Sequence, residues 1–265
     1  MSLDKILVIV DPTTTTQPAF ARALHSAQLT GARLHLYTCI EESGARETDE
    51  AQQQTCMKAQ KKLIASAEEH GIDASGEVEI GRNWCQQVVS AAARCTASMV
   101  FKSTRDHSDV DREMRQTSDW TLLRLSPCPV LLVKDFHDWK NRRVLAAINT
   151  RSKDVAHIKL NNQIISFAQQ FSEAYGADPH FVNAYSDSNQ VPDIDQLADA
   201  CGVPCEHVHV VEGGAADVIA GMAADIDADL IIIGTVGRAG LKGTVVGNTS
   251  ERILDHTDSD VLVLN

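Results

Sequence analysis

One strand–helix pattern is written twice along this chain, and this repeat limits the fold more than any other feature. The segment 5–11 is apolar on both faces and rich in β-branched residues, and 143–149 repeats it. Such runs are typical of parallel strands that helices cover on both sides. Amphipathic helices are expected next, over 18–29 in one half and 160–175 in the other.

The remaining elements recur in the same order in both halves. We expect strands at 33–38, 77–80, 98–102 and 129–133, and their counterparts at 180–185, 207–211, 230–233 and 260–264. Further helices are expected over 84–95 and 215–224, while Gly31 and Gly176 occupy places typical of helix C-caps. This alternation predicts an α/β fold of two tandem open-sheet domains, each a five-stranded parallel sheet with helices on both faces.

The boundary between the two domains is expected in the segment 136–142, which is polar and aromatic and lacks a periodic pattern. A chain of 265 residues divides naturally into two domains of about 130 residues. We therefore expect domains at 1–137 and 138–265.

Five glycines lie within the fourteen residues from Gly234 to Gly247, after the apolar run 230–233 and before the helix-like segment 250–255. Glycines let the main chain approach a phosphate closely, and the first N–H groups of a helix are unpaired anion donors. The order Lys242-Gly243-Thr244 differs from that of a Walker loop. The context nevertheless favours a phosphate-binding loop over an ordinary flexible one.

Several residues around this loop are candidate ligand contacts. Asn149 ends the first strand of the second half, where open α/β sheets bind ligands; the alternative is a turn residue. Asn248 is expected to cap the last helix, with Glu251 completing a capping box. The predicted cofactor-binding residues are Asn149, Gly234, Thr235, Gly237, Arg238, Gly247, Asn248, Thr249 and Ser250.

The first half differs at the equivalent loop, since no glycine occurs between 103 and 120. Asp106, Asp109 and Asp111 would repel a phosphate there. We expect this domain to be degenerate, and the second domain to carry the nucleotide site. Asp11, at the end of the first strand, could hold a ribose hydroxyl or a magnesium ion.

The net charge and the cysteine content indicate which binding partners and which cellular compartment to expect. The net charge of −12 argues against nucleic acid and against an anionic membrane surface. Seven scattered cysteines and the lack of a signal peptide or membrane span favour the cytoplasm. Cys201 and Cys205, with His207 and His209 after them, are read as a turn leading into a strand; we predict no metal site and no catalytic residues.

The spacing Gly234-x-x-Gly237, nine residues, Gly247 and a polar residue resembles the ATP-binding signature of the universal stress protein family. Ser250–His256 with 260–264, and 126–133 in the first half, match the closing elements of that family. The likeness covers essentially the full chain twice, and most resembles the tandem-domain E type. It implies a fold of the adenine-nucleotide alpha-hydrolase-like class, with phosphates against Gly237, Gly247, Asn248 and Thr249 and ribose near Gly234.

The resemblance implies a stress-response protein that binds ATP, with or without Mg²⁺, in its second domain, and at most hydrolyses it slowly. Family members commonly have Asp where this chain has Asn149, and Ser or Thr where it has Asn248. The resemblance also implies that 129–133 and 260–264 join the domains as an internal pseudo-dimer, while a homodimer stays open. The alternative is a scaffold for an apolar metabolite or protein partner, suggested by Trp84, Met99, Met114 and Trp120.

Overall fold

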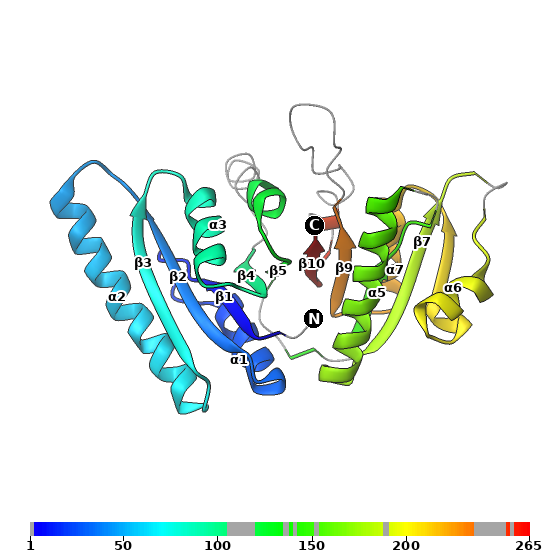
Figure 1. The fold of residues 1–265 in the computed structure, drawn as a ribbon, viewed down its shortest axis with the longest axis horizontal. Coiled ribbons are helices and arrows are strands. Elements are labelled where there is room, and N and C mark those ends of the chain that lie inside the picture. Colours follow the sequence, from blue (N-terminus) through cyan, green and yellow to red (C-terminus); the bar gives the residue numbers. More distant parts are fainter. Residues whose placement is uncertain are drawn as a thin grey trace. The chain divides into compact units, whose positions relative to one another are not determined.

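A computed structural model describes residues 3–104, 120–134, 138–139, 142–150, 154–187, 191–235, 253–254 and 257–265. The chain divides into two compact units, Met1–Phe136 and His137–Asn265. Each unit is an α/β structure with a parallel sheet, which confirms the predicted fold class (Figure 1).

The first unit contains five strands and three long helices among its described residues. They are β1 (Lys5–Ile9), α1 (Pro18–Thr30), β2 (Arg33–Glu41), α2 (Arg46–Glu69), β3 (Ala74–Gly81), α3 (Trp84–Arg94), β4 (Met99–Ser103) and β5 (Val130–Val133). Residues 120–125 are also helical. The strand order is β3-β2-β1-β4-β5, with parallel pairing between the neighbouring strands.

The second unit repeats this arrangement. Its elements are β6 (Arg143–Ala147), α5 (Val155–Tyr175), β7 (Asp178–Tyr185), α6 (Ile194–Cys201), the short 3₁₀ helix η2 (Cys205–His207), β8 (Val208–Glu212), α7 (Ala215–Asp225), β9 (Leu230–Gly234) and β10 (Asp260–Leu264). The order β8-β7-β6-β9-β10 is the counterpart of that in the first unit, and the pairs are again parallel.

Helices cover both faces of each sheet because the chain moves across the sheet in both directions. Parallel strands are joined by right-handed crossovers. The step from β6 to β7 and the step from β8 to β9 run in opposite directions, so α5 and α7 lie on opposite faces (Figure 1). The central strands are therefore enclosed, and Leu230, Ile231 and Ile232 have no exposed surface.

Two glycines end helices as the sequence predicts. Gly31 follows α1 with φ of 73°, and its N–H donates to the carbonyl of Ala27 at 2.8 Å. Gly176 follows α5 with φ of 61°. Both backbones are left-handed, a conformation that glycine adopts without the steric cost of a Cβ atom.

The helices α2 and α6 and the helical segment 120–125 were not predicted from the sequence. The face of α2 that is buried includes Asp49, Cys56 and Gln60, so the helix lacks the apolar stripe that reveals an amphipathic helix. Gln60 instead donates from Nε2 to the carbonyls of Leu36 and Glu77, at 3.1 and 3.0 Å. α6 has only eight residues, and α5 begins at 155 rather than 160.

The expected linker 136–142 contains a residue that belongs to the core of the second unit. Trp139 is 7% exposed, and its indole N–H donates to Oδ2 of Asp260 at 3.2 Å. Its ring also packs against Phe171 and Tyr175 of α5, with centroid distances of 5.8 and 5.3 Å. An aromatic residue with a polar tip satisfies both demands of such a position.

Candidate functional site

The candidate site lies at the carboxyl edge of the second sheet, between β6 and β9. The chain leaves β6 toward β7 on one side, while β9 occupies the other side. In open α/β sheets, ligands bind in the crevice beyond the strand ends at such a switch point. The pairs Val144↔Leu230 and Ala146↔Ile232 fix the register. The residues after β6 and the end of β9 are therefore neighbours.

Asn149 follows β6, and its main chain is held by one carboxamide. Its N–H donates to Oδ1 of Asn161 at 3.1 Å, and Nδ2 of Asn161 donates back to its carbonyl at 2.7 Å. Because Asn161 lies on α5, this helix fixes the direction in which the chain leaves β6. Sequence reasoning missed Asn161, whose polar side chain within a helix was the available signal.

Gly234 ends β9 and has a packing reason to be glycine. A Cβ atom at this position would lie 2.4 Å from Cδ2 and 2.6 Å from Cγ of Leu160. Real side chains do not approach so closely, and Leu160 is itself buried in α5. The missing side chain thus lets α5 pack directly on the end of β9.

Thr235 continues from β9 and is tied to the neighbouring strand. Its N–H donates to the carbonyl of Leu264 at 2.8 Å, and its hydroxyl donates to Oδ1 of Asn265 at 2.8 Å. The chain therefore leaves the sheet from a fixed point. The other predicted contacts, Gly237, Arg238, Gly247, Asn248, Thr249 and Ser250, lie outside the described residues.

A second carboxamide, that of Asn183, supports the same edge from β7. Asn183 is 1% exposed, and its Nδ2 donates to the carbonyl of Ile148 at 3.2 Å and to Oγ1 of Thr150 at 3.0 Å. Its Oδ1 has no hydrogen-bond partner among the described residues. Sequence reasoning missed Asn183 as well, although an amide within an apolar strand is an uncommon choice.

In the first unit, the residue equivalent to Asn149 is Asp11, which forms hydrogen bonds within its own loop. Oδ1 of Asp11 accepts from the N–H and hydroxyl of Thr13, at 2.8 and 2.6 Å. This contact closes a local turn, and a ribose or magnesium contact at Asp11 stays a prediction. Met99 and Trp120 are buried, and Nζ of Lys102 lies 5.7 Å from the ring centroid of Trp84. Met114 lies outside the described residues.

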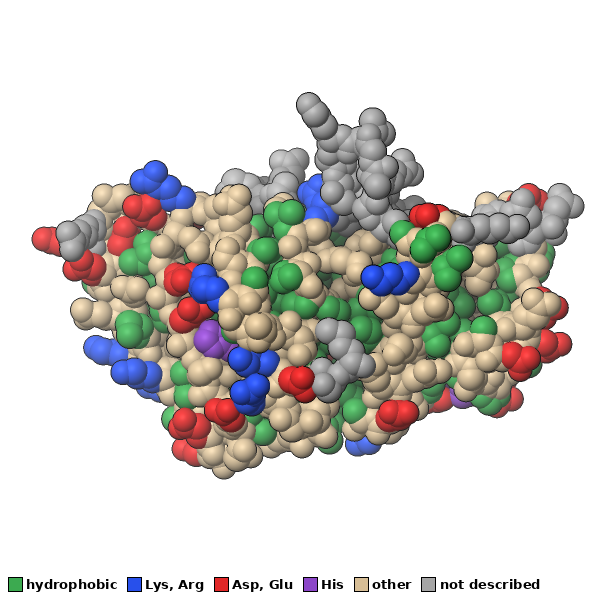
Figure 2. Space-filling model, in the orientation of Figure 1, with side chains coloured by type: hydrophobic (Ala, Val, Ile, Leu, Met, Phe, Trp, Pro, Cys, Tyr) green, Lys and Arg blue, Asp and Glu red, His purple; other side chains and the backbone are tan. Residues whose placement is uncertain are grey.

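The face drawn in Figure 2 shows no large basic patch among the described residues. Lys and Arg side chains are interspersed there with Asp and Glu. That distribution agrees with the net charge of −12. Within the described part of the chain, every helix is too short or too polar to cross a bilayer.

The repeated strand order and the helices on both faces define a tandem, doubly wound α/β protein. Comparison with known proteins identifies the family within this class. The Universal stress protein family matches residues 2–134 and 163–265. The chain therefore belongs to the universal stress protein family.

Similar proteins extend over nearly the whole chain. Universal stress protein E of Salmonella typhi is 26% identical over 98% of this chain and 93% of its own length. The universal stress protein E homologue from Haemophilus influenzae is 26% identical over 99% of this chain and 97% of its own length. A crystal structure described as that of a universal stress protein from Pseudomonas aeruginosa UCBPP-PA14 has a TM-score of 0.81 at 28% identity, with 99% and 93% covered. The crystal structure of a universal stress protein from Archaeoglobus fulgidus has a TM-score of 0.81 at 18% sequence identity, and the match covers 100% of this chain and 97% of that one. At this identity the likeness shows the fold alone.

Proposed function

We propose that the second unit binds an adenine nucleotide, ATP, and that this binding serves a stress response in the cytoplasm. One observation carries the proposal: the glycine-rich segment starts at the end of β9, directly beside the residues that follow β6. Main-chain N–H groups of such a segment can surround a phosphate even in an acidic protein.

The described residues supply a fixed frame for this site. Asn161 holds the chain after β6, Asn183 holds Ile148, and Thr235 is tied to Leu264. A site whose anchor points are held by hydrogen bonds pays less ordering entropy when a ligand binds. We assign ribose to the vicinity of Gly234 and Asn149, and the phosphates to the segment that follows.

Binding, rather than turnover, is the expected activity. Hydrolysis of ATP requires a positioned water and neutralisation of the charge on the transferred phosphoryl group. Asn149 offers a neutral carboxamide at the end of β6, where a carboxylate would help hold Mg²⁺. We therefore expect ATP affinity to depend weakly on Mg²⁺.

The cytoplasmic assignment is supported by the cysteines. All seven lie in the described residues, and each is a free thiol. Burial raises the pKa of the Cys128 and Cys201 thiols to about 11. Free and largely buried thiols suit a reducing compartment.

Isothermal titration of the full chain with ATP, with and without Mg²⁺, tests the proposal. Gly247→Val should weaken ATP binding at least tenfold, because a β-branched side chain blocks close approach of a phosphate. Gly221→Val is the matched control, since a Cβ atom at Gly221 of α7 meets nothing within 4 Å. An absence of heat and of any thermal shift at millimolar ATP would contradict the nucleotide assignment.

A further inference from the structure

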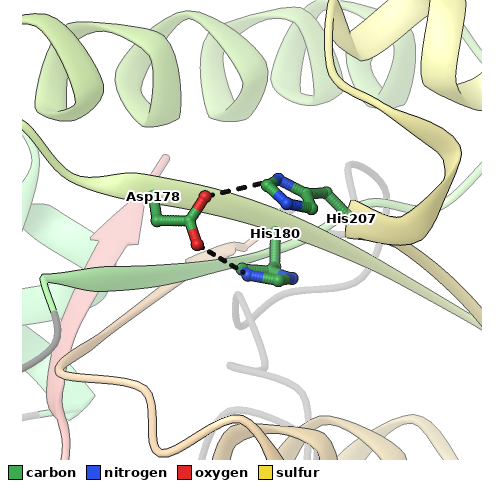
Figure 3. Close-up of side chains that lie close together, drawn as sticks. All are labelled: Asp178, His180 and His207. Carbon is green, nitrogen blue, oxygen red and sulfur yellow. Dashed lines mark hydrogen bonds and ion pairs between the residues drawn. The ribbon is translucent and has the colours of Figure 1, made fainter.

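Three potential metal ligands meet at the amino edge of the second sheet. Asp178 and His180 point to the same side of β7, and His207 ends η2 immediately before β8 (Figure 3). The pairing Phe181↔Val208 brings His180 and His207 side by side. Since all strands of this sheet are parallel, the cluster lies at the edge opposite to the candidate nucleotide site.

The distances within the cluster suit a small divalent ion. Oδ2 of Asp178 lies 3.3 Å from Nε2 of His180, and Oδ1 of Asp178 lies 3.3 Å from Nδ1 of His207. Ligand atoms around tetrahedral zinc, at 2.0–2.1 Å from the ion, are about 3.3 Å apart. One ligand atom from each of the three side chains lies within 4.8 Å of the others. The rings of His180 and His207 stack with a centroid distance of 4.4 Å, so both imidazoles must turn about their side-chain bonds for their nitrogens to face one ion.

His209 supplies a partner behind the cluster. Nδ1 of His180 lies 3.1 Å from Nε2 of His209. If Nε2 of His180 coordinates an ion, its Nδ1–H is in place to donate to His209. A hydrogen bond of this kind fixes the tautomer and orientation of a ligating histidine.

His180 and His209 lie in a partly buried environment that lowers the pKa of both imidazoles. Burial lowers the pKa of His180, with a further decrease from neighbouring His207, while Asp178 opposes it. Burial and the two other histidines also lower the pKa of His209. The cation of Arg143, on β6, acts in the same direction on His180, and its Nη1 donates to the carbonyl of Ile226 at 2.6 Å.

We propose that Asp178, His180 and His207 form a binding site for a zinc ion. Two imidazoles and one carboxylate match the preferences of zinc and leave a fourth position for water. Asp178 and His207 are accessible, with side-chain exposures of 44% and 22%, so the ion can enter from solvent. The residues Cys201 and Cys205 are separate from this set: Cys201 is buried, and Sγ of Cys205 donates to Asp195 at 3.2 Å.

The test titrates Zn²⁺ into the untagged, chelator-stripped full chain by calorimetry. We expect one equivalent to bind. Asp178→Asn and His207→Ala should each weaken Zn²⁺ binding by at least about 10–100-fold. This is the loss typical when an outer-shell partner of a ligand is removed, and a ligand itself should matter at least as much. Co²⁺ should give the visible absorption of a tetrahedral site, and this signal should disappear in His207→Ala. Both altered residues are partly exposed, and circular dichroism verifies that the variants fold.

The controls separate this site from adventitious binding. His157→Ala removes another histidine that faces a carboxylate, with Nδ1 of His157 3.3 Å from Oδ2 of Asp154. No third potential ligand joins this pair among the described residues, so Zn²⁺ affinity should be unchanged. Cys205→Ser should also leave it unchanged. The assignment is overturned if Zn²⁺ does not bind at micromolar concentration, or if Cys205→Ser abolishes binding that His207→Ala retains.

Discussion

At the end of the fourth strand, the first unit has Ser103 where the second has Gly234. Both residues are followed by a threonine whose N–H donates to the last strand, at 2.7 Å for Thr104 and 2.8 Å for Thr235. Oγ of Ser103 accepts a hydrogen bond from the N–H of Ala19 at 3.0 Å, and so satisfies a main-chain donor in the first turn of α1. In the first unit, the residue at this position binds the N-terminus of a helix through its side chain. In the second unit, the glycine at this position allows close contact between α5 and β9, and a glycine-rich sequence follows it.

The amino edges differ in a similar way. The pairs Leu7↔His35 and Leu145↔His180 place the two histidines at equivalent positions. Arg33 then corresponds to Asp178, because Lys5↔Arg33 and Arg143↔Asp178 are the first pairs of each ladder. Ser75, which pairs with His35, stands at the position of His207. The register is preserved between the units while the chemistry of its side chains is free to change.

The largest expected effect is the gain of a second metal site. Arg33→Asp combined with Ser75→His would give the first unit the ligand set of the second, since His35 is already present and its Nδ1 lies 2.9 Å from Oγ of Ser75. Calorimetry should then show two equivalents of Zn²⁺ instead of one. Arg33→Asp alone is the control and should leave one equivalent. Unchanged stoichiometry in the double variant would show that the two edges differ in more than these residues.

A smaller effect is expected from placing the residue that ends the fourth strand of the first unit, a serine, at the equivalent Gly234 of the second. Gly234→Ser should lower the free energy of unfolding by about 1–3 kcal/mol, because the new side chain collides with Leu160. Urea denaturation measures the change. Gly221→Ala, in the open part of α7, should instead raise stability by about 0.5–1 kcal/mol. An equal response of the two glycines would remove the packing explanation.

The smallest effect concerns the amides that hold the chain after the first strand of each unit. Gln17 donates from Nε2 to the carbonyl of Asp11 at 2.7 Å and accepts from its N–H at 3.1 Å, just as Asn161 does for Asn149. Gln17→Ala and Asn161→Ala should each cost about 1 kcal/mol of stability. Only Asn161→Ala should also weaken ATP binding.

Thermal denaturation and ATP calorimetry together measure both consequences. Asn162→Ala is the matched control for Asn161, because Asn162 is the exposed neighbour on α5. Stability and ATP binding should both be unchanged in this variant. If Gln17→Ala weakened ATP binding as much as Asn161→Ala, the nucleotide site would not be confined to the second unit.

The sequence predicted the strands and their parallel arrangement well because each is a short apolar run between clear helix and loop signals. It failed at α2, where Gln60 and Asp49 face inward and remove the apolar stripe. Of the predicted ligand contacts, Asn149, Gly234 and Thr235 lie among the described residues, and their contact with a ligand stays a prediction. Asn161 and Asn183 were missed because their roles depend on contacts between elements that are distant in sequence.

The zinc-site candidate shows the same limit more sharply. In the sequence, His207 and His209 follow Cys201 and Cys205, and we interpreted the segment as a turn leading into a strand, with no metal site. Strand pairing instead places His207 next to His180 and Asp178, which are 27 and 29 residues earlier in the numbering. Register between neighbouring strands has to be known before such a ligand set can be recognised.

The hydrogen bond from Trp139 to Asp260 affects how the second half can be prepared as a separate protein. Asp260 is entirely buried, so a fragment that starts after Trp139 would leave its carboxylate without the indole donor. It would also uncover the aromatic surface of Phe171 and Tyr175. An expression fragment meant to fold by itself should therefore begin upstream of Trp139, even though β6 starts only at Arg143.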